Sequence, residues 1–179
     1  MIGLAKHFAL SVKIGLLVAC TAVSVQGVHK IYITSEQAEA LCDQLFHMIK
    51  KDNFEPDLII GLSRGGLVPL GYLAGEKLFD VRTVYSLGVQ SYDRMQQGNI
   101  SLVFPFHIDD IKQFHSILVI DDIVDTGKTI AFVKELFEKH GITATVKFAA
   151  LYYKSQRSFM KPDYYVEETD DWVVFPWQS

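Results

Sequence analysis

The fold of this chain is decided by Ile117-Leu118-Val119-Ile120-Asp121-Asp122-Ile123-Val124-Asp125-Thr126-Gly127-Lys128-Thr129. The four apolar, mostly β-branched residues that open the segment predict a buried strand. Two adjacent carboxylates follow where that strand is expected to leave the sheet, and a polar loop then leads into an amphipathic stretch from Ile130 to His140. Loop amides and a helix N-terminus bind phosphate, and carboxylates bind sugar hydroxyls or hydrated magnesium. The segment therefore predicts a site for a phosphorylated sugar.

Two other interpretations of this segment are weaker. Gly127-Lys128-Thr129 matches the end of a Walker A loop, but that motif needs another glycine at position 122, where this chain has Asp122. An ordinary strand, turn and helix would not need two neighbouring carboxylates, because like charges placed together repel each other. The pattern therefore favours a functional site.

The segment resembles the phosphoribosyl-pyrophosphate (PRPP) signature of the type I phosphoribosyltransferases. The match covers the hydrophobic run, the acidic pair and the residues Asp125, Thr126, Gly127 and Thr129. The resemblance implies that Asp121 and Asp122 hold the ribose hydroxyls and Mg²⁺. It also implies that Asp125 is the catalytic residue that handles the purine N7 proton, and that the 5′-phosphate is bound by Asp125, Thr126, Gly127, Lys128 and Thr129.

Composition limits the class of protein. With 179 residues, 49% of them hydrophobic and 21% charged, the chain is expected to form one globular domain. The net charge of -4 argues against a nucleic-acid-binding surface. The two cysteines suggest neither a disulfide framework nor a metal site, and Cys42 is expected to be buried on an apolar helix face.

The N-terminal residues 1–28 are apolar apart from a few positions such as Lys6, His7 and Lys13. Three explanations stay open: a misassigned start codon, a targeting segment or an extra packing element. We rank the first highest, because PRPP is an intracellular metabolite and an exported enzyme would lack its substrate. We therefore expect a phosphoribosyltransferase domain at residues 29–179, a cytoplasmic location and no membrane partner.

Strand and helix patterns alternate along the rest of the chain. We expect strands at 30–33, 58–62, 81–87, 117–120, 143–151, 164–166 and 172–175, and helices at 34–51, 68–79 and 130–140. The polar connection 88–115 is expected to be functional or mobile. This alternation predicts an α/β fold with a doubly wound, mainly parallel sheet flanked by helices, whose ligands bind at the carboxyl ends of the strands.

A second motif, Gly61-Leu62-Ser63-Arg64-Gly65, fits the G-x-S-x-G nucleophile elbow of serine hydrolases. That chemistry needs an acid and then a histidine after the serine, and the histidine available after Asp125 is His140, at a predicted helix end. The alternative is an anion-binding turn, in which glycines let backbone amides approach the ligand and Arg64 supplies charge. Residues 63–69 resemble the bacterial xanthine-guanine phosphoribosyltransferases, which implies that Ser63, Arg64 and Gly65 bind pyrophosphate.

The resemblance extends to the purine end of the site. It implies that Lys154 donates to the purine O6 and that Trp172 and Val173, in a small hood, contact the base. It also implies that Ser91, Tyr92 and Asp93 belong to a mobile catalytic loop. The chain departs from the pattern in residues 1–28, and at Gln178 and Ser179, where related chains often carry an acid and a longer tail.

The function implied is transfer of the 5-phosphoribosyl group from PRPP to a 6-oxopurine (guanine, xanthine or hypoxanthine), giving a nucleoside 5′-monophosphate and pyrophosphate in purine salvage. The expected cofactor is Mg²⁺, and the expected assembly is a homodimer or homotetramer. The three bases are not distinguished, because the lysine and hood contact features that they share. A PRPP- or purine-sensing regulator is the non-enzymatic alternative, although the sequence has no basic patch or added DNA-binding domain.

Overall fold

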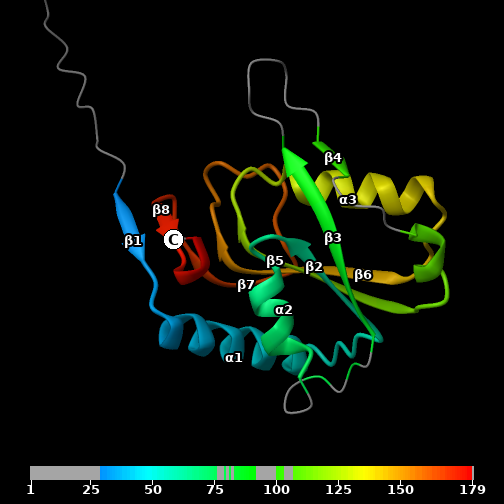
Figure 1. Cartoon of the computed structure of the whole chain (residues 1–179), viewed down its shortest axis with the longest axis horizontal. Helices are drawn as coiled ribbons and strands as arrows, with labels where there is room; N and C mark the ends of the chain where they lie inside the picture. Colours follow the sequence, from blue (N-terminus) through cyan, green and yellow to red (C-terminus); the bar gives the residue numbers. More distant parts are fainter. Residues whose placement is uncertain are drawn as a thin grey trace, which may run out of the picture.

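The structure is a computed structural model that describes residues 29–75, 79, 81, 83–91, 100–102 and 107–178 (Figure 1). The N-terminal extension 1–28, and Tyr92 and Asp93 of the expected mobile loop, lie outside the described residues. Within the described ranges, no helix combines the length and apolar character needed to cross a bilayer.

The centre of the fold is a mainly parallel sheet with the strand order β4-β3-β2-β5-β6-β7. Five of these strands run parallel, and the short β4 pairs antiparallel with β3 at one edge. The strands are β2 (Leu58–Ser63), β3 (Val84–Ser91), β4 (Ile100–Leu102), β5 (Ser116–Val124), β6 (Thr145–Tyr153) and β7 (Tyr164–Glu168). The expected mainly parallel sheet is therefore confirmed.

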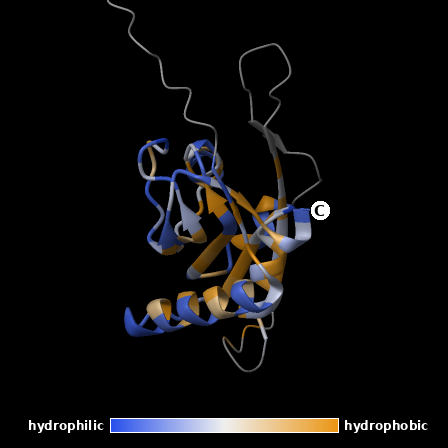
Figure 2. Ribbon diagram, turned by 90° about the vertical axis from the view of Figure 1, so that its left-hand side faces the viewer, coloured by the Kyte–Doolittle hydropathy of each residue, from blue (hydrophilic) through white to orange (hydrophobic). Residues whose placement is uncertain are grey.

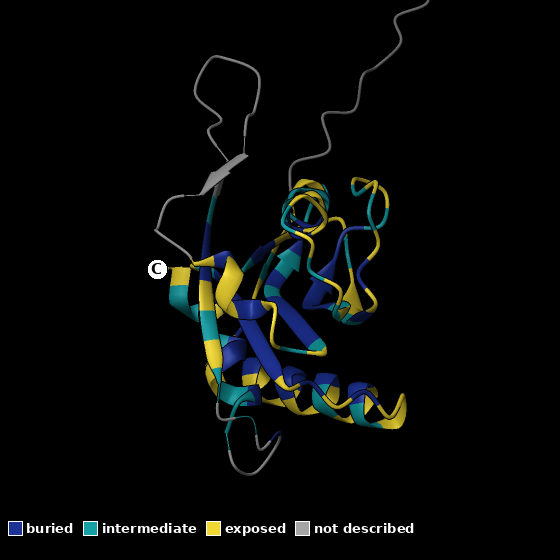
Figure 3. Ribbon diagram, turned by 90° about the vertical axis from the view of Figure 1, so that its right-hand side faces the viewer, coloured by how far each residue is buried: buried dark blue, intermediate teal, exposed yellow. Residues whose placement is uncertain are grey.

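Helices cover both faces of the sheet (Figures 1 and 2). Alternate strand residues point to opposite faces, so Leu118 and Ile120 pack toward α1 (Ser35–Lys51) and α2 (Leu67–Leu73), whereas Val119 packs toward α3 (Lys128–Lys139). The 3₁₀ helix η1 (Ile108–Ile111) joins the α3 side. The strands are buried between helices whose outer faces are exposed (Figure 3). The expected doubly wound arrangement is confirmed.

A second, two-stranded parallel sheet forms the hood. In it, β1 (Lys30–Tyr32) pairs with β8 (Trp172–Val174), and the 3₁₀ helix η2 (Pro176–Gln178) follows β8. The backbone N–H of Trp172 also donates to the carbonyl oxygen of His29 at 2.9 Å. The start of the described chain therefore supports the strand that carries Trp172.

The predicted features of α1 are confirmed. Thr34 and Gln37 form a capping box in which each side chain accepts a hydrogen bond from the other's backbone N–H, and Lys50 and Lys51 lie in the last turn. Cys42 is fully buried on the apolar face, and burial raises the pKa of its thiol to about 12.

Several predicted boundaries differ from those in the structure. The helix expected at 68–79 ends at Leu73, since Gly75 follows its C-cap and glycine is a poor helix former. The strand expected at 81–87 begins at Val84, which pairs with Ile59 near the start of β2. That strand continues to Ser91 because β4 pairs with its far end, so the connection 88–115 is more regular than expected.

The strand before the acidic pair is also longer than predicted. It does not leave the sheet at Ile120, because β6 continues alongside it and pairs with it as far as Val124. Its pairing with β2, in contrast, stops at Ile120. Asp121 and Asp122 therefore lie within β5, at the point where one of its two neighbouring strands departs.

Candidate active site

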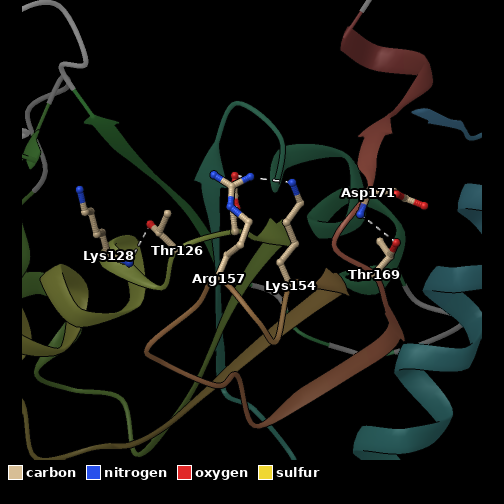
Figure 4. A network of polar contacts seen from close by, with 7 residues as sticks. Thr126, Lys128, Lys154, Arg157, Thr169 and Asp171 are labelled. Atoms are coloured by element: carbon tan, nitrogen blue, oxygen red, sulfur yellow. Dashed lines mark hydrogen bonds and ion pairs between the residues drawn. The ribbon is translucent and has the colours of Figure 1, made fainter. Parts of the chain in front are cut away.

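The loop after β5 enters α3 through a left-handed residue. Gly127 has a φ of +80°, a conformation that glycine adopts without strain. A Cβ at this position would also lie 2.6 Å from the Ser158 hydroxyl oxygen. The backbone N–H of Lys128 points toward the Thr126 hydroxyl, which lies 3.4 Å away (Figure 4). The loop and the N-terminus of α3 border a small hollow of about 100 Å³, lined by Asp121, Asp125, Thr126, Gly127 and Thr129 among others.

The turn between β2 and α2 borders a second hollow. It contains Ser63, Arg64, Gly65 and Gly66, and the Gly66 N–H donates to the Leu62 carbonyl oxygen at 2.8 Å. A Cβ on Gly65 would lie 2.2 Å from a carboxylate oxygen of Asp122, so only glycine fits there. The hollow has a volume of about 370 Å³ and is lined by Arg64, Gly65, Asp122, Trp177 and Gln178.

The two adjacent carboxylates lie on opposite sides of the sheet. Asp121 lines the hollow beside α3, whereas Asp122 lines the hollow beside the Arg64 turn, as expected for successive residues of a strand. Asp122 is buried, and its Oδ2 accepts hydrogen bonds from Trp177 Nε1 at 3.0 Å and Gln178 Nε2 at 3.4 Å.

The electrostatics of this pair suit a cation. Burial and the negative charge of Asp122 raise the pKa of Asp121 well above its usual range. Burial also raises the pKa of Asp122, although the Trp177 hydrogen bond acts in the opposite direction. Among the described residues no cluster of three acidic, histidine or cysteine side chains could enclose a metal. Mg²⁺ needs no such cluster, since one or two carboxylates, water and substrate phosphates suffice, so the residues fit this ion.

Two positively charged side chains from the segment after β6 form ion pairs with Asp125. Its Oδ2 lies 3.7 Å from Lys154 Nζ and its Oδ1 lies 3.3 Å from Arg157 Nε (Figure 4). Within the part of the chain that the structure describes, Oδ1 is buried and has no hydrogen-bond donor of good geometry. This leaves Asp125 one acceptor oxygen that a bound ligand can use.

Lys154 connects this carboxylate to the hood. Its side chain is only 4% exposed, and its Nζ lies 5.6 Å from the centre of the Trp172 ring. Trp172 itself is 51% exposed, while Val173 is buried beneath the hood. An accessible aromatic face next to a buried ammonium group can stack a planar heterocycle and donate to its carbonyl oxygen.

Backbone hydrogen bonds fix this geometry. The N–H of Lys154 donates to the Val124 carbonyl oxygen at 3.0 Å, and the N–H of Phe159 donates to that of Thr126 at 3.2 Å. The segment that carries Lys154 and Arg157 is therefore attached along the loop that carries Asp125.

The structure thus brings most of the predicted site residues to one edge of the sheet. Of the three residues expected in a mobile loop, Ser91 is the one that the structure describes, and it is the last residue of β3. Sequence reasoning missed Arg157 and Trp177, and it singled out Gln178 only as a departure from the family's pattern. A second cation shortly after Lys154 was a signal that could have indicated Arg157, whereas nothing in the local pattern pointed Trp177 and Gln178 toward Asp122.

The geometry does not support the serine hydrolase. Ser63 lies at the carboxyl end of β2, at the same edge as Gly127, while His140 caps the other end of α3. The 12 residues of this helix separate His140 from Gly127 by about 18 Å. A histidine at the end of α3 that is remote from this edge cannot activate the serine.

Comparisons with known proteins show the family to which the chain belongs. The family described as "Phosphoribosyl transferase domain" matches residues 30–179. The xanthine-guanine phosphoribosyltransferase of Cereibacter sphaeroides is 34% identical over 127 residues, 70% of this chain and 71% of the relative. That of Idiomarina loihiensis is 34% identical over 120 residues, 66% of this chain and 69% of the relative. A crystal structure of a purine phosphoribosyltransferase from Pyrococcus horikoshii aligns with a TM-score of 0.72 and 33% identity, and covers 84% of this chain and 95% of that one.

Proposed function

Because this chain belongs to the phosphoribosyltransferase family, we propose that it transfers the 5-phosphoribosyl group from PRPP to a 6-oxopurine, releasing pyrophosphate. The observation that carries the proposal is the position of Asp125. This carboxylate lies in the loop between β5 and α3 and also contacts Lys154, which lies against the Trp172 ring. A sugar phosphate on that loop and a purine on that ring would meet beside Asp125.

The PRPP end of the reaction uses three elements. The amides of residues 126–129 and the N-terminus of α3 would hold the 5′-phosphate. Asp121 would accept hydrogen bonds from the ribose hydroxyls, and Arg64 with the Gly65 amide would bind the pyrophosphate. Asp121 and Asp122 would hold hydrated Mg²⁺, partly through its water molecules, and the ion when bound supplies positive charge for the leaving group.

The purine end uses the hood and the end of β6. The base would stack on Trp172, with its edge against the backbone of Val173 and its O6 accepting a hydrogen bond from Lys154. Asp125 would accept the N7 proton as the purine N9 bonds to the ribose C1 and the C1–O bond to pyrophosphate breaks. Arg157 would hold Asp125 in place. Since O6 and N7 are common to guanine, xanthine and hypoxanthine, these contacts serve all three bases.

We also propose the features that the family membership suggests beyond this site: a catalytic domain at residues 29–179, a closing loop around Ser91, Tyr92 and Asp93, a cytoplasmic location where PRPP is made, and a homodimer or homotetramer.

The test is a panel of bases. Protein, Mg²⁺ and PRPP are mixed with guanine, xanthine, hypoxanthine or adenine, and pyrophosphate and the nucleotide product are measured. We expect pyrophosphate release with at least one 6-oxopurine and little with adenine, which lacks the O6 acceptor. Binding of PRPP without pyrophosphate release with any base would contradict the proposed enzyme and favour a PRPP-sensing regulator.

A further inference from the structure

The C-terminal turn η2 makes a contact that the reaction above does not use. Trp177 and Gln178 both donate hydrogen bonds to one oxygen of Asp122. We propose that these two side chains are positioning residues for PRPP binding, because they fix Asp122 against Gly65 and thereby fix the pyrophosphate-binding turn. This inference rests on the proposed function.

The position of Asp122 supports a role separate from that of Asp121. Asp122 faces the hollow formed by Arg64, Gly65 and the C-terminal turn, while Asp121 faces the phosphate-binding loop. We therefore expect Asp121 to make most of the contacts with the sugar. The role of Asp122 follows from what lies on either side of it, which is the Gly65 backbone and the donors of η2.

The contact with Gly65 is close enough to couple the two groups. A carboxylate oxygen and the carboxyl carbon of Asp122 lie 2.2 and 2.3 Å from where a Cβ of residue 65 would stand. The backbone of the turn therefore lies directly against the carboxylate. If the Asp122 side chain rotated toward the turn, the backbone of Gly65 would have to move. The conformation of Arg64 and Gly65 thus depends on the side-chain angle of Asp122.

The two donors also control where the negative charge of Asp122 lies relative to Arg64. An unrestrained carboxylate beside Arg64 would compete with pyrophosphate for the guanidinium group and repel the anion. Trp177 and Gln178 hold the carboxylate oxygen on the side of η2, and as neutral donors they do so without adding a cation that would bind pyrophosphate itself.

Packing fixes the two donors. The Trp177 ring stacks on the ring of Phe175, with centres 4.7 Å apart and an interplanar angle of 12°. Phe175 is 1% exposed and packs edge-on against Tyr152 of β6. The Gln178 N–H donates to the Phe175 carbonyl oxygen at 3.1 Å. The turn is therefore attached to the core rather than free in solvent.

The decisive variant is Trp177→Phe, which keeps an aromatic ring on Phe175 but removes the N–H. A hydrogen bond to a charged group is worth about tenfold or more in affinity. We expect the dissociation constant of PRPP with Mg²⁺, measured by calorimetry, to rise about tenfold, while the KM for the purine and the thermal midpoint stay nearly unchanged. Gln178→Ala should cause a smaller rise, and Gln113→Ala, which removes an amide bonded to the Asp110 carbonyl oxygen in another turn, should cause none.

A double-mutant cycle tests whether Trp177 acts through Asp122. In an Asp122→Ala background the indole has no carboxylate to hold, so Trp177→Phe should then change PRPP affinity less than about twofold. Fully additive effects would overturn the inference, as would equal PRPP affinity of wild type and Trp177→Phe. If the wild type itself neither binds PRPP nor releases pyrophosphate, it is the proposed function that fails.

Discussion

At the scale of single residues, Asp125 joins the two halves of the site. Lys154 and Arg157 contact its two oxygens, and the chain continues from it into residues 126–129, which we propose bind the 5′-phosphate. Oδ1 is buried without a hydrogen bond of good geometry among the described residues, an arrangement that is costly unless a ligand completes it. This position suits a group that accepts a proton during the reaction.

Asp125→Asn is expected to keep PRPP binding but to lower kcat about 10²–10⁴-fold, the usual contribution of a positioned acid or base. The amide keeps the shape of the side chain but cannot take up the proton. Steady-state kinetics together with PRPP calorimetry separate the two effects. Asp170→Asn, at an exposed position between β7 and β8, serves as the control. An unchanged kcat would exclude Asp125 from proton transfer.

Lys154→Met is expected to raise the KM for the purine about tenfold, the value of one hydrogen bond to a charged donor. The effect on PRPP affinity should be smaller, because the lysine lies between Asp125 and the Trp172 ring, on which the purine is proposed to stack. Initial rates with each substrate varied in turn measure both. Lys139→Met, exposed in the last turn of α3, should behave as wild type. A larger effect on PRPP than on purine would refute the purine assignment.

At the scale of elements, register decides which predictions from sequence succeed. Periodicity and capping residues were sufficient for α1, since Thr34, Gln37 and Lys51 define its ends locally. The length of β5 was not predictable in the same way, because its last four residues are held by β6, which is distant in sequence. Nor could any local pattern show that Trp177 would lie against Asp122, since that contact spans 55 residues.

The relative positions of the motif residues, unlike the ends of the strands, could be predicted from the sequence. Asp125, Gly127 and Lys154 lie together because parallel strands end at one edge of the sheet, so their order along the chain already predicted their proximity. The direction of each acid is a matter of strand pairing, and a strand ending at Ile120 would have placed both acids in a loop.

Asp57 links the first residues of β2 and β5 and gives a pH-dependent prediction. Burial alone would raise the pKa of this carboxyl, but hydrogen bonds from the backbone N–H groups of His115 and Ser116, both at 2.9 Å, outweigh burial and lower it. A carboxyl whose pKa is lower in the folded state stabilises the fold at pH values above its unfolded pKa of about 4, and this contribution is lost as the pH falls through its folded pKa.

Asp57→Asn should therefore lower the urea midpoint of unfolding at pH 6. The difference between the midpoints of variant and wild type should become smaller as the pH falls below about 4. The amide removes the charge and one of the two acceptors. Urea titrations from pH 6 to pH 3 measure this, with the exposed Asp110→Asn as the control. A difference that stays constant across the range would mean that the hydrogen bonds do not depend on the charge of Asp57.

At the scale of the whole molecule, the site depends on a core formed in two layers. One cluster of buried residues lies between the sheet and α1, α2 and the hood, and includes Val173 and Phe175. The other lies between the sheet and α3 and includes Ile130 and Val133. The loop between β5 and α3 and the hood are therefore held on opposite layers, and the shared strands β5 and β6 set the distance between them.

This organisation predicts the result of shortening the chain. The family match covers residues 30–179, and β1, the first described strand, begins at Lys30. A chain of residues 29–179 is therefore expected to keep the thermal midpoint and the kcat/KM for PRPP of the full chain. Removing β1 as well, by starting at residue 34, should raise the purine KM, because the strand that carries Trp172 then loses its partner. If the first truncation alone lowered the midpoint by more than a few degrees, residues 1–28 would be part of the packed domain rather than an extension of it.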